Sequence, residues 1–229
     1  MQAVIRKIIP DQVSPLTPIS PMPDYVHEIR LGRLSGKIIC GVDEVGRGPL
    51  AGPVVAAAVI LPQDFPEVIS SKIRDSKKMS ALARENIFDP LTQHCRYAIA
   101  EANVEEIDRL NILWATMLAM QRAVEKLATK IDVALIDGNR APKLDCEAVT
   151  LIKGDDKSLS IAAASIIAKV HRDRLMKKLA KEFGAYGWDH NAGYGTSEHL
   201  IALEQHGITL HHRTSFAPVL AAAKKKDSR

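Results

Sequence analysis

The chain of 229 residues is poor in cysteine, with only Cys40, Cys95 and Cys146. An odd number of distant cysteines without a Cys-x-x-Cys pair argues against a disulfide framework and favours reduced thiols. Long hydrophobic runs are also missing. The longest, residues 54–61, is far shorter than the roughly twenty residues that cross a bilayer. No apolar core of a secretion signal follows the N-terminus. We therefore expect a cytoplasmic protein without a membrane span.

An excess of charge of one sign is nearly absent from the body of the chain. The formal net charge is +4, but residues 41–223 carry a net charge of −1, and the two ends carry the positive balance. The basic pI of about 8.9 therefore favours solvated terminal segments over a basic nucleic-acid surface. The hydrophobic fraction of 46% and the length are sufficient for a folded core without disulfides.

Prolines near the N-terminus and lysines near the C-terminus divide the chain into three parts. Residues 10–23 hold five of them, and proline prevents a helix or an inner strand there. We predict a proline-rich arm over residues 1–35, a folded domain over residues 36–220 and a basic C-terminal tail over residues 221–229.

Hydrophobic periodicity within the domain predicts an α/β fold. Three strands come first, and later strands alternate with helices, which favours a mixed β-sheet flanked by α-helices with a C-terminal helical segment. Expected strands are residues 37–45, 54–61, 97–104, 133–136 and 148–152, and expected helices are residues 80–93, 105–128, 158–183 and 196–205.

Four carboxylates stand at strand ends. Asp43 and Glu44 lie inside an apolar strand pattern, Asp137 follows another, and Asp155 precedes the long helix. A carboxylate is costly in such a place unless it is paired, protonated or bound to a metal. The carboxyl ends of parallel strands meet at one edge of a sheet, and clustered oxygen ligands suit Mg²⁺ or Mn²⁺. The alternative is a set of strand-end acids that face water.

Other motifs match less well. Residues 46–51 fit G-x-G-x-x-A, but prolines lead them into a strand, whereas a dinucleotide site needs a helix. Residues 153–158 lack the spacing of a phosphate loop. Six of the eight histidines lie between His171 and His212, and we interpret them as scattered surface residues rather than a zinc site. Tyr194 lies in a glycine-flanked loop, either as a turn residue or as an exposed ring for stacking on a sugar or base.

Seven segments carry a resemblance to a known family. They are GVDEVGRGPLAGPVV (41–55), DSKKMS (75–80), EIDRLNILWATMLAMQRAV (106–124), LIDGNR (135–140), KGDDKS to AAASIIAKVHRD (153–173), GYGTSEH (193–199) and HHRTSFAPV (211–219). On these segments, over roughly residues 37–219, the chain resembles bacterial ribonuclease H type 2 (RNase HII).

The resemblance implies a ribonuclease H-like fold and an endoribonuclease. Such an enzyme hydrolyses the RNA strand of RNA–DNA hybrids and cuts 5′ to single ribonucleotides embedded in duplex DNA. It uses two divalent ions, Mn²⁺ or Mg²⁺, and leaves a 3′-hydroxyl and a 5′-phosphate. Its partners are these nucleic acids, its state is expected to be monomeric, and its task is primer removal in DNA replication or ribonucleotide excision repair.

By motif position, the resemblance also assigns residues. The catalytic and metal-binding carboxylates fall on Asp43, Glu44, Asp137 and Asp155, with Asp156 as the rival of Asp155. Gly46, Arg47 and Gly48 match the motif that contacts the ribose 2′-hydroxyl, and Tyr194 matches a tyrosine that stacks on the next, deoxy sugar. The candidate phosphate contacts, for which a solvated face is the alternative, are Lys77, Lys78, Lys169 and Arg172.

Two other function classes remain open on the sequence. One is another nuclease or strand-transferase with the same sheet and carboxylates. The other is a hybrid-binding protein without activity, against which the presence of all four carboxylates argues.

Overall fold

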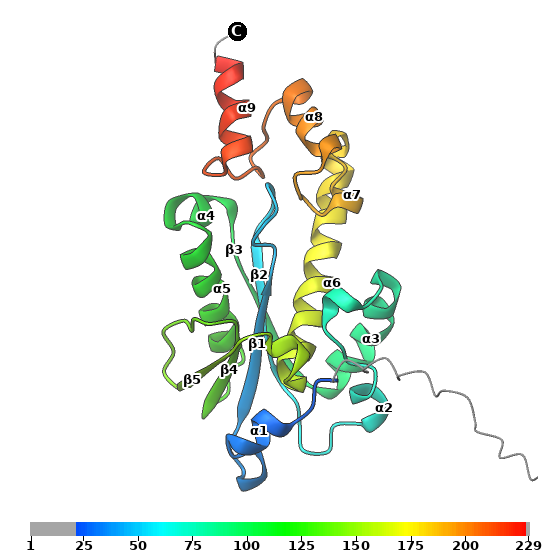
Figure 1. The fold of residues 1–229 in the computed structure, drawn as a ribbon, viewed down its shortest axis with the longest axis vertical. Helices are drawn as coiled ribbons and strands as arrows, with labels where there is room; N and C mark the ends of the chain where they lie inside the picture. The colour runs from blue at the N-terminus through cyan, green and yellow to red at the C-terminus, as the bar shows by residue number, and fades with distance from the viewer. Residues whose placement is uncertain (1–21, 228–229) are drawn as a thin grey trace, which may run out of the picture.

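The computed structural model describes residues 22–227. In this part, five strands form one sheet between two helical layers (Figure 1). Their order across the sheet is β3-β2-β1-β4-β5. The strands are β1 (Ile39–Val45), β2 (Val54–Ile60), β3 (Arg96–Ala102), β4 (Val133–Asp137) and β5 (Glu147–Leu151).

The sheet is mixed, as the sequence predicts. The first three strands form antiparallel pairs, β1 with β2 and β2 with β3. The pairs β1 with β4 and β4 with β5 are parallel. Because β1 and β4 are parallel neighbours, their carboxyl ends meet at the same edge, which is where ligands gather in open sheets.

Helices cover both faces of the sheet (Figure 1). On one face lie α4 (Val104–Leu110) and α5 (Ile112–Lys126), and the α5 side chains Ala119 and Met120 share a core with Val42 and Ala56. On the other face, α6 (Leu159–Glu182) packs with α2 (Glu67–Ser70) and α3 (Ala81–His94) around the core that contains Ala57. The predicted helices over residues 80–93 and 158–183 are thus confirmed.

Gly41 allows α6 to lie directly on β1. A Cβ atom at this position would come within 2.2 Å of the carbonyl carbon of Ser160, so only glycine fits. The close approach of strand and helix brings the first turns of α6 beside the end of β1.

The single helix predicted over residues 105–128 is wrong. It is interrupted at Asn111, whose φ of 68° ends α4. The Asn111 side chain then caps α5, because it accepts hydrogen bonds from the amides of Leu113 at 3.0 Å and Trp114 at 3.3 Å.

The described part of the predicted arm is docked on the domain, while residues 1–21 lie outside the described residues. It forms α1 (Val26–Arg30) and the short 3-10 helix η1 (Arg33–Ser35). Glu28 is buried at the start of α6, where its Oε1 accepts from the hydroxyls of Ser158 and Ser160, both at 2.7 Å. Arg33 donates to the carbonyl of Leu61 at 2.8 Å.

A helical segment follows α6 at the far end of the sheet, as expected (Figure 1). It comprises η4 (Gly184–Tyr186), α7 (Trp188–Asn191), α8 (Ser197–His206) and α9 (Ala217–Asp227). The last helix includes residues 221–227 of the predicted tail, and residues 228–229 lie outside the described range. Among the described residues, no helix combines the length and apolar character that a membrane crossing requires.

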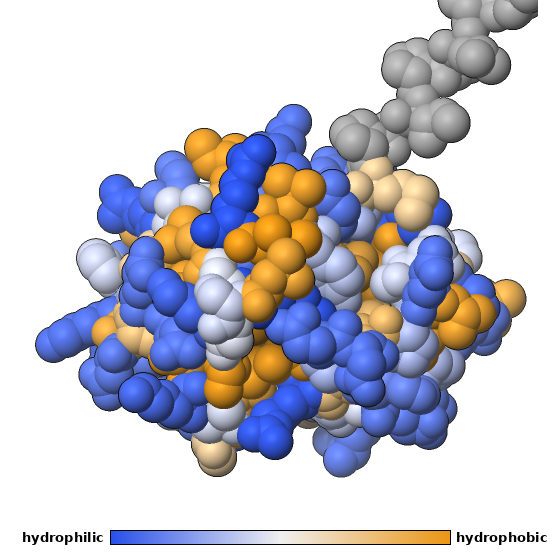
Figure 2. Space-filling model, turned by 90° about the horizontal axis from the view of Figure 1, so that it is seen from below, coloured by the Kyte–Doolittle hydropathy of each residue, from blue (hydrophilic) through white to orange (hydrophobic). Residues whose placement is uncertain are grey.

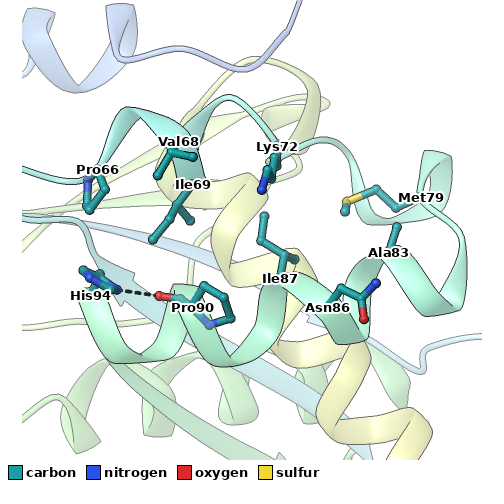
Figure 3. Close-up of a pocket in the computed structure, with 10 residues that line it drawn as sticks. All are labelled: Pro66, Val68, Ile69, Lys72, Met79, Ala83, Asn86, Ile87, Pro90 and His94. Carbon is teal, nitrogen blue, oxygen red and sulfur yellow. Dashed lines mark hydrogen bonds between the residues drawn. The ribbon is translucent and has the colours of Figure 1, made fainter.

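An apolar groove of ≈ 620 Å³ lies between α2 and α3. Ile69 of α2 and Ile87 of α3 line opposite sides of it, with Met79 toward one end and His94 toward the other (Figure 3). Seen from the end of the molecule that carries α1, apolar groups (orange) alternate with hydrophilic ones (blue) over the surface (Figure 2). No predicted catalytic carboxylate lines the groove, so it is separate from the candidate active site.

Candidate active site

The candidate site is built around three carboxylates. Asp43 and Glu44 of β1 and Asp137 at the end of β4 each offer an oxygen, and these atoms lie within 4.8 Å of one another. The parallel register pairs Val42 with Ile136, so the residues that follow, Asp43 and Asp137, are neighbours. The sheet therefore brings together three of the four predicted acids.

Asp43 and Glu44 meet although successive strand residues face opposite sides of a sheet. Asp43 pairs with Ala57 on the α6 face, and Glu44 pairs with Ala56 on the α5 face. The strand ends at the next residue, and Asp43 Oδ1 turns back to accept a hydrogen bond from the Glu44 amide at 2.7 Å. Because β1 ends here, the two carboxylates can lie close together, which the regular alternation of side chains along a strand would prevent.

The fourth acid borders this cluster. Asp155 is buried in η3 (Gly154–Asp156), and its Oδ2 accepts from Lys77 Nζ at 3.1 Å. The preceding amide, of Gly154, donates to Asp137 Oδ1 at 2.7 Å, which ties η3 to the end of β4. Its rival Asp156 is more exposed and pairs with Lys78.

The pKa values of the three clustered carboxyls are raised. Burial is the largest cause for each, and repulsion from Glu44 and Asp137 raises the pKa of Asp43 further. The pKa of Lys77 is also raised, because the hydrogen bond and the charge of Asp155 outweigh the effect of burial. Like charges held close together in this way are stabilised by a bound cation.

The donor set fits a divalent metal. All three groups offer hard carboxylate oxygens, and such ligands favour Mg²⁺ or Mn²⁺ over metals that select nitrogen or sulfur. Asp43, Glu44 and Asp137 would hold an ion between them, with Asp155 at the edge of the same site.

Two buried arginines hold the backbone of the loop after β1 in place. Arg213 donates to the carbonyls of Gly46 at 2.6 Å, Arg47 at 3.0 Å and Gly52 at 2.9 Å. Arg172 donates to the carbonyls of Ala51, Pro53 and Ala192. Both guanidiniums are fully buried, and burial lowers the pKa of Arg172 to about 10 and that of Arg213 to about 9.

The expectation that Arg172 contacts a phosphate is therefore wrong. Its guanidinium is shielded from solvent and bonded to backbone carbonyls, so it supports the loop from inside. Gly46 packs against it with a φ of 90°, and a Cβ there would lie 2.1 Å from Arg172 Nε. The role of Arg213 was not predicted, although HHRTSF belongs to the matching segments.

The loop over residues 46–53 leads into β2 and not into a helix, as expected. Two amides of this loop, those of Arg47 and Gly48, donate no hydrogen bond within residues 22–227. Since a trans peptide points its C=O and N–H in opposite directions, the bonds from Arg213 to the carbonyls of Gly46 and Arg47 turn these two amides away from the arginine.

Tyr194 lies beside this loop with about half of its surface exposed. A Cβ at Gly48 would come within 3.2 Å of Tyr194 Cε1, so ring and glycine are in contact. Arg47 reaches back to Glu44 Oε1 at 3.3 Å. The predicted sugar-contacting residues thus adjoin the acid cluster.

The remaining predicted contact, Lys169, is engaged within α6. Its Nζ donates to Asp173 at 2.6 Å, one turn further along the helix. Its role toward a phosphate stays a prediction.

Two histidines contradict the surface interpretation. His199 and His212 are fully buried, and their Nε2 atoms lie 3.0 Å apart. The sequence spacing gave no sign of this, because the two residues meet only through the turn after α8.

The rivalry between Asp155 and Asp156 yields a direct test. Because Asp155 is buried beside the cluster, the Asp155→Asn variant is expected to lose at least about tenfold in cleavage rate. Asp156→Asn removes a charge paired on the surface and should stay within a few-fold of the wild type. The cleavage rates of the two variants are compared at saturating metal concentration. A larger loss in Asp156→Asn than in Asp155→Asn would assign the metal-binding role to Asp156.

Solved structures define the class of protein to which this fold and site belong. The ribonuclease H2 of Pyrococcus horikoshii OT3 matches with a TM-score of 0.70 at 25% identity, covering 83% of this chain and 99% of that one. Bst-RNase HIII in complex with Mn²⁺ matches in fold with a TM-score of 0.64 at 20% identity, covering 84% and 71%. The protein therefore has the ribonuclease H-like fold.

Sequence relatives narrow this class to one family. The family model for Ribonuclease HII matches residues 40–219. The Ribonuclease HII of Rhodospirillum rubrum is 53% identical over 204 residues, which cover 88% of this chain and 92% of that protein. That of Burkholderia thailandensis is 56% identical over 188 residues, covering 82% and 86%. The chain belongs to the ribonuclease HII family and is a nuclease, which confirms the resemblance seen in the sequence.

Proposed function

We propose that this nuclease hydrolyses the RNA strand of RNA–DNA hybrids and cuts 5′ to single ribonucleotides in duplex DNA, leaving a 3′-hydroxyl and a 5′-phosphate. The observation that carries the proposal is the acid cluster of Asp43, Glu44 and Asp137, set beside a glycine loop with free amides.

In this proposal the four acids act as ligands. Two divalent ions, Mn²⁺ or Mg²⁺, would supply a nucleophilic water and charge stabilisation for the leaving oxygen. Asp43, Glu44, Asp137 and Asp155 would hold the cations, and Lys77 keeps Asp155 in place through its 3.1 Å hydrogen bond. The clustered negative charge, which together with burial raises the pKa values of these carboxyls, would attract the cations.

The loop over residues 46–48 and Tyr194 would choose the nucleotide. The amides of Arg47 and Gly48 are suited to hydrogen-bond a ribose 2′-hydroxyl, the group that distinguishes RNA from DNA. Tyr194 would lie against the following deoxy sugar, where an added hydroxyl would clash with its ring. Lys77, Lys169 and the Arg47 side chain would approach the phosphates.

A duplex DNA with one internal ribonucleotide tests the proposal. With Mn²⁺ or Mg²⁺, we expect one cut on the 5′ side of the ribonucleotide, and none in the matched all-DNA duplex. Denaturing gels with labelled strands locate the cut, and the labelled termini identify the products. A folded sample that leaves the ribonucleotide intact in both metals would contradict the proposal.

The same assay separates the alternatives. Cleavage of the all-DNA duplex would favour a nuclease or strand-transferase without sugar selectivity. Metal-independent binding without turnover would favour a hybrid-binding protein. We further propose that the protein acts as a cytoplasmic monomer in ribonucleotide excision repair or primer removal, for which the relative rates on single ribonucleotides and long hybrids are informative.

A further inference from the structure

The backbone of Tyr194 is held at both of its polar groups. Its amide donates to the carbonyl of Asn191 at 2.9 Å. Its carbonyl accepts two hydrogen bonds, one from the Thr196 amide at 2.8 Å and one from the His199 ring at 2.9 Å. The ring of Tyr194 is half exposed and contacts Gly48, so its position depends on how this backbone is held.

The hydrogen-bond partners of His199 determine which of its two ring nitrogens carries the proton. Nδ1 faces the carbonyl oxygen of Tyr194, which can only accept, so Nδ1 must donate. Nε2 faces the indole N–H of Trp188 at 3.2 Å, which can only donate, so Nε2 must accept. His199 is therefore neutral with its proton on Nδ1, whereas the neutral ring in water carries the proton mainly on Nε2.

His212 continues the same chain. Its Nδ1 accepts from the amide of Thr209 at 2.9 Å, so its own proton is on Nε2. This Nε2 lies 3.0 Å from His199 Nε2 and donates to it, so the single lone pair of His199 Nε2 is shared between the N–H groups of Trp188 and His212. The two rings thus form one directed series of hydrogen bonds that runs from Thr209 to the carbonyl of Tyr194.

We propose that His199, held in its Nδ1–H form by Trp188 and His212, is a positioning residue that fixes Tyr194 against the sugar of the substrate. The inference rests on the role of Tyr194 in the proposed function. It adds that selectivity depends on a buried polar network behind the tyrosine.

The electrostatics of the network agree with the assignment. Burial lowers the pKa of His199, and burial together with the neighbouring His199 lowers the pKa of His212 to about 3. A second proton on His199 would point at the indole N–H, so both rings stay neutral. Trp188 and both histidines are fully buried, which keeps water from replacing these bonds.

Nitrogen NMR of the uniformly ¹⁵N-labelled wild-type protein tests the arrangement without reference to activity. Long-range ¹H–¹⁵N spectra at neutral pH should show His199 protonated on Nδ1 and His212 protonated on Nε2. A His199 proton on Nε2, or a charged His199 ring, would overturn the arrangement.

A set of variants tests the positioning role. The ratio of cleavage at a single ribonucleotide to cleavage within continuous RNA should fall about five- to tenfold in His199→Leu, since the hydrogen bond from His199 to the carbonyl of Tyr194 is lost. His199→Asn places an amide donor near Nδ1 and should recover most of the ratio. His206→Leu, the same change at an exposed histidine of α8, should leave the ratio unchanged. If His199→Leu does not fold, the cleavage ratio of His199→Asn and the NMR spectra of the wild type still test the proposal.

A double-mutant cycle separates positioning from general support of the fold. In a Tyr194→Ala background, His199→Leu should have no further effect on the ratio. An equal loss in both backgrounds would overturn the positioning role. An unchanged ratio in Tyr194→Ala alone would contradict the role proposed for the tyrosine and the functional half of this inference, while the NMR result would stand independently.

Discussion

Replacement of Asp43 or Asp137 by asparagine is expected to reduce strand cleavage by more than about 100-fold. Even groups that only orient a metal ligand cost about 10–100-fold when removed, and these two carboxylates are proposed to bind the cations themselves. Each of them carries one of the three carboxylate oxygens that lie within 4.8 Å of one another. Single-turnover cleavage of the ribonucleotide duplex measures the loss.

The same variants should not lose stability. The pKa of the Asp43 carboxyl is raised in the folded chain, first by burial and then by the neighbouring carboxylates. Such a group destabilises the fold fully at a pH above its folded pKa, and this penalty shrinks as the pH falls below the folded pKa and vanishes below the unfolded pKa. At neutral pH without divalent ions, Asp43→Asn should therefore unfold at the same temperature as the wild type or a higher one.

Metal addition distinguishes loss of a ligand from loss of structure. Mn²⁺ should raise the unfolding temperature of the wild type, since it binds only the folded state, and should raise that of Asp43→Asn less. Asp145→Asn, an equal loss of charge at an exposed position, serves as the control and should behave like the wild type. Wild-type cleavage in Asp43→Asn or Asp137→Asn would refute the assigned roles.

Replacement of Arg213 by methionine should lower the free energy of unfolding by about 3 kcal/mol, because buried carbonyls lose a charged donor. The guanidinium bonds three carbonyls of the loop after β1, and methionine fills a similar volume without a donor. Relief of an unpaired buried charge offsets part of the loss, so the net change stays below the sum of the bonds. Urea unfolding gives the value, and cleavage should weaken together with it.

Arg174→Met is the matched control for this prediction. Arg174 pairs with Glu85 at the surface, so its loss should change the free energy of unfolding by less than about 1 kcal/mol. Equal stability of Arg213→Met and wild type would show that the carbonyls find other partners and that the loop does not need the arginine.

The sheet and the acid cluster could be predicted because their signals are local. Apolar runs marked the strands, and an acid at the end of a buried run has few reasons to be there other than chemistry. Asp43, Glu44 and Asp137 were found in this way, and the parallel register of β1 and β4 brings them together. The family resemblance added the likeness of Gly46, Gly48 and Tyr194 to sugar-contacting residues.

The predictions that proved wrong concern residues whose conformation or burial is determined by tertiary contacts. The apolar periodicity runs on through Asn111, so it did not reveal that the chain changes direction there and starts a second helix. Arg172 and the histidines His199 and His212 belong to residue types that are usually exposed, and their partners are carbonyls and rings distant in sequence. Their burial follows from the fold and is not encoded in any local pattern.

The hydrogen bonds between Glu28 and the start of α6 have a consequence for the order in which parts of the chain fold. Its partners, Ser158 and Ser160, lie 130 and 132 residues further along the chain. During synthesis α1 leaves the ribosome early, yet its binding place exists only after α6 has been made and has folded onto β1. Contacts of such separation are slow to close, so the first described helix is among the last to find its native place.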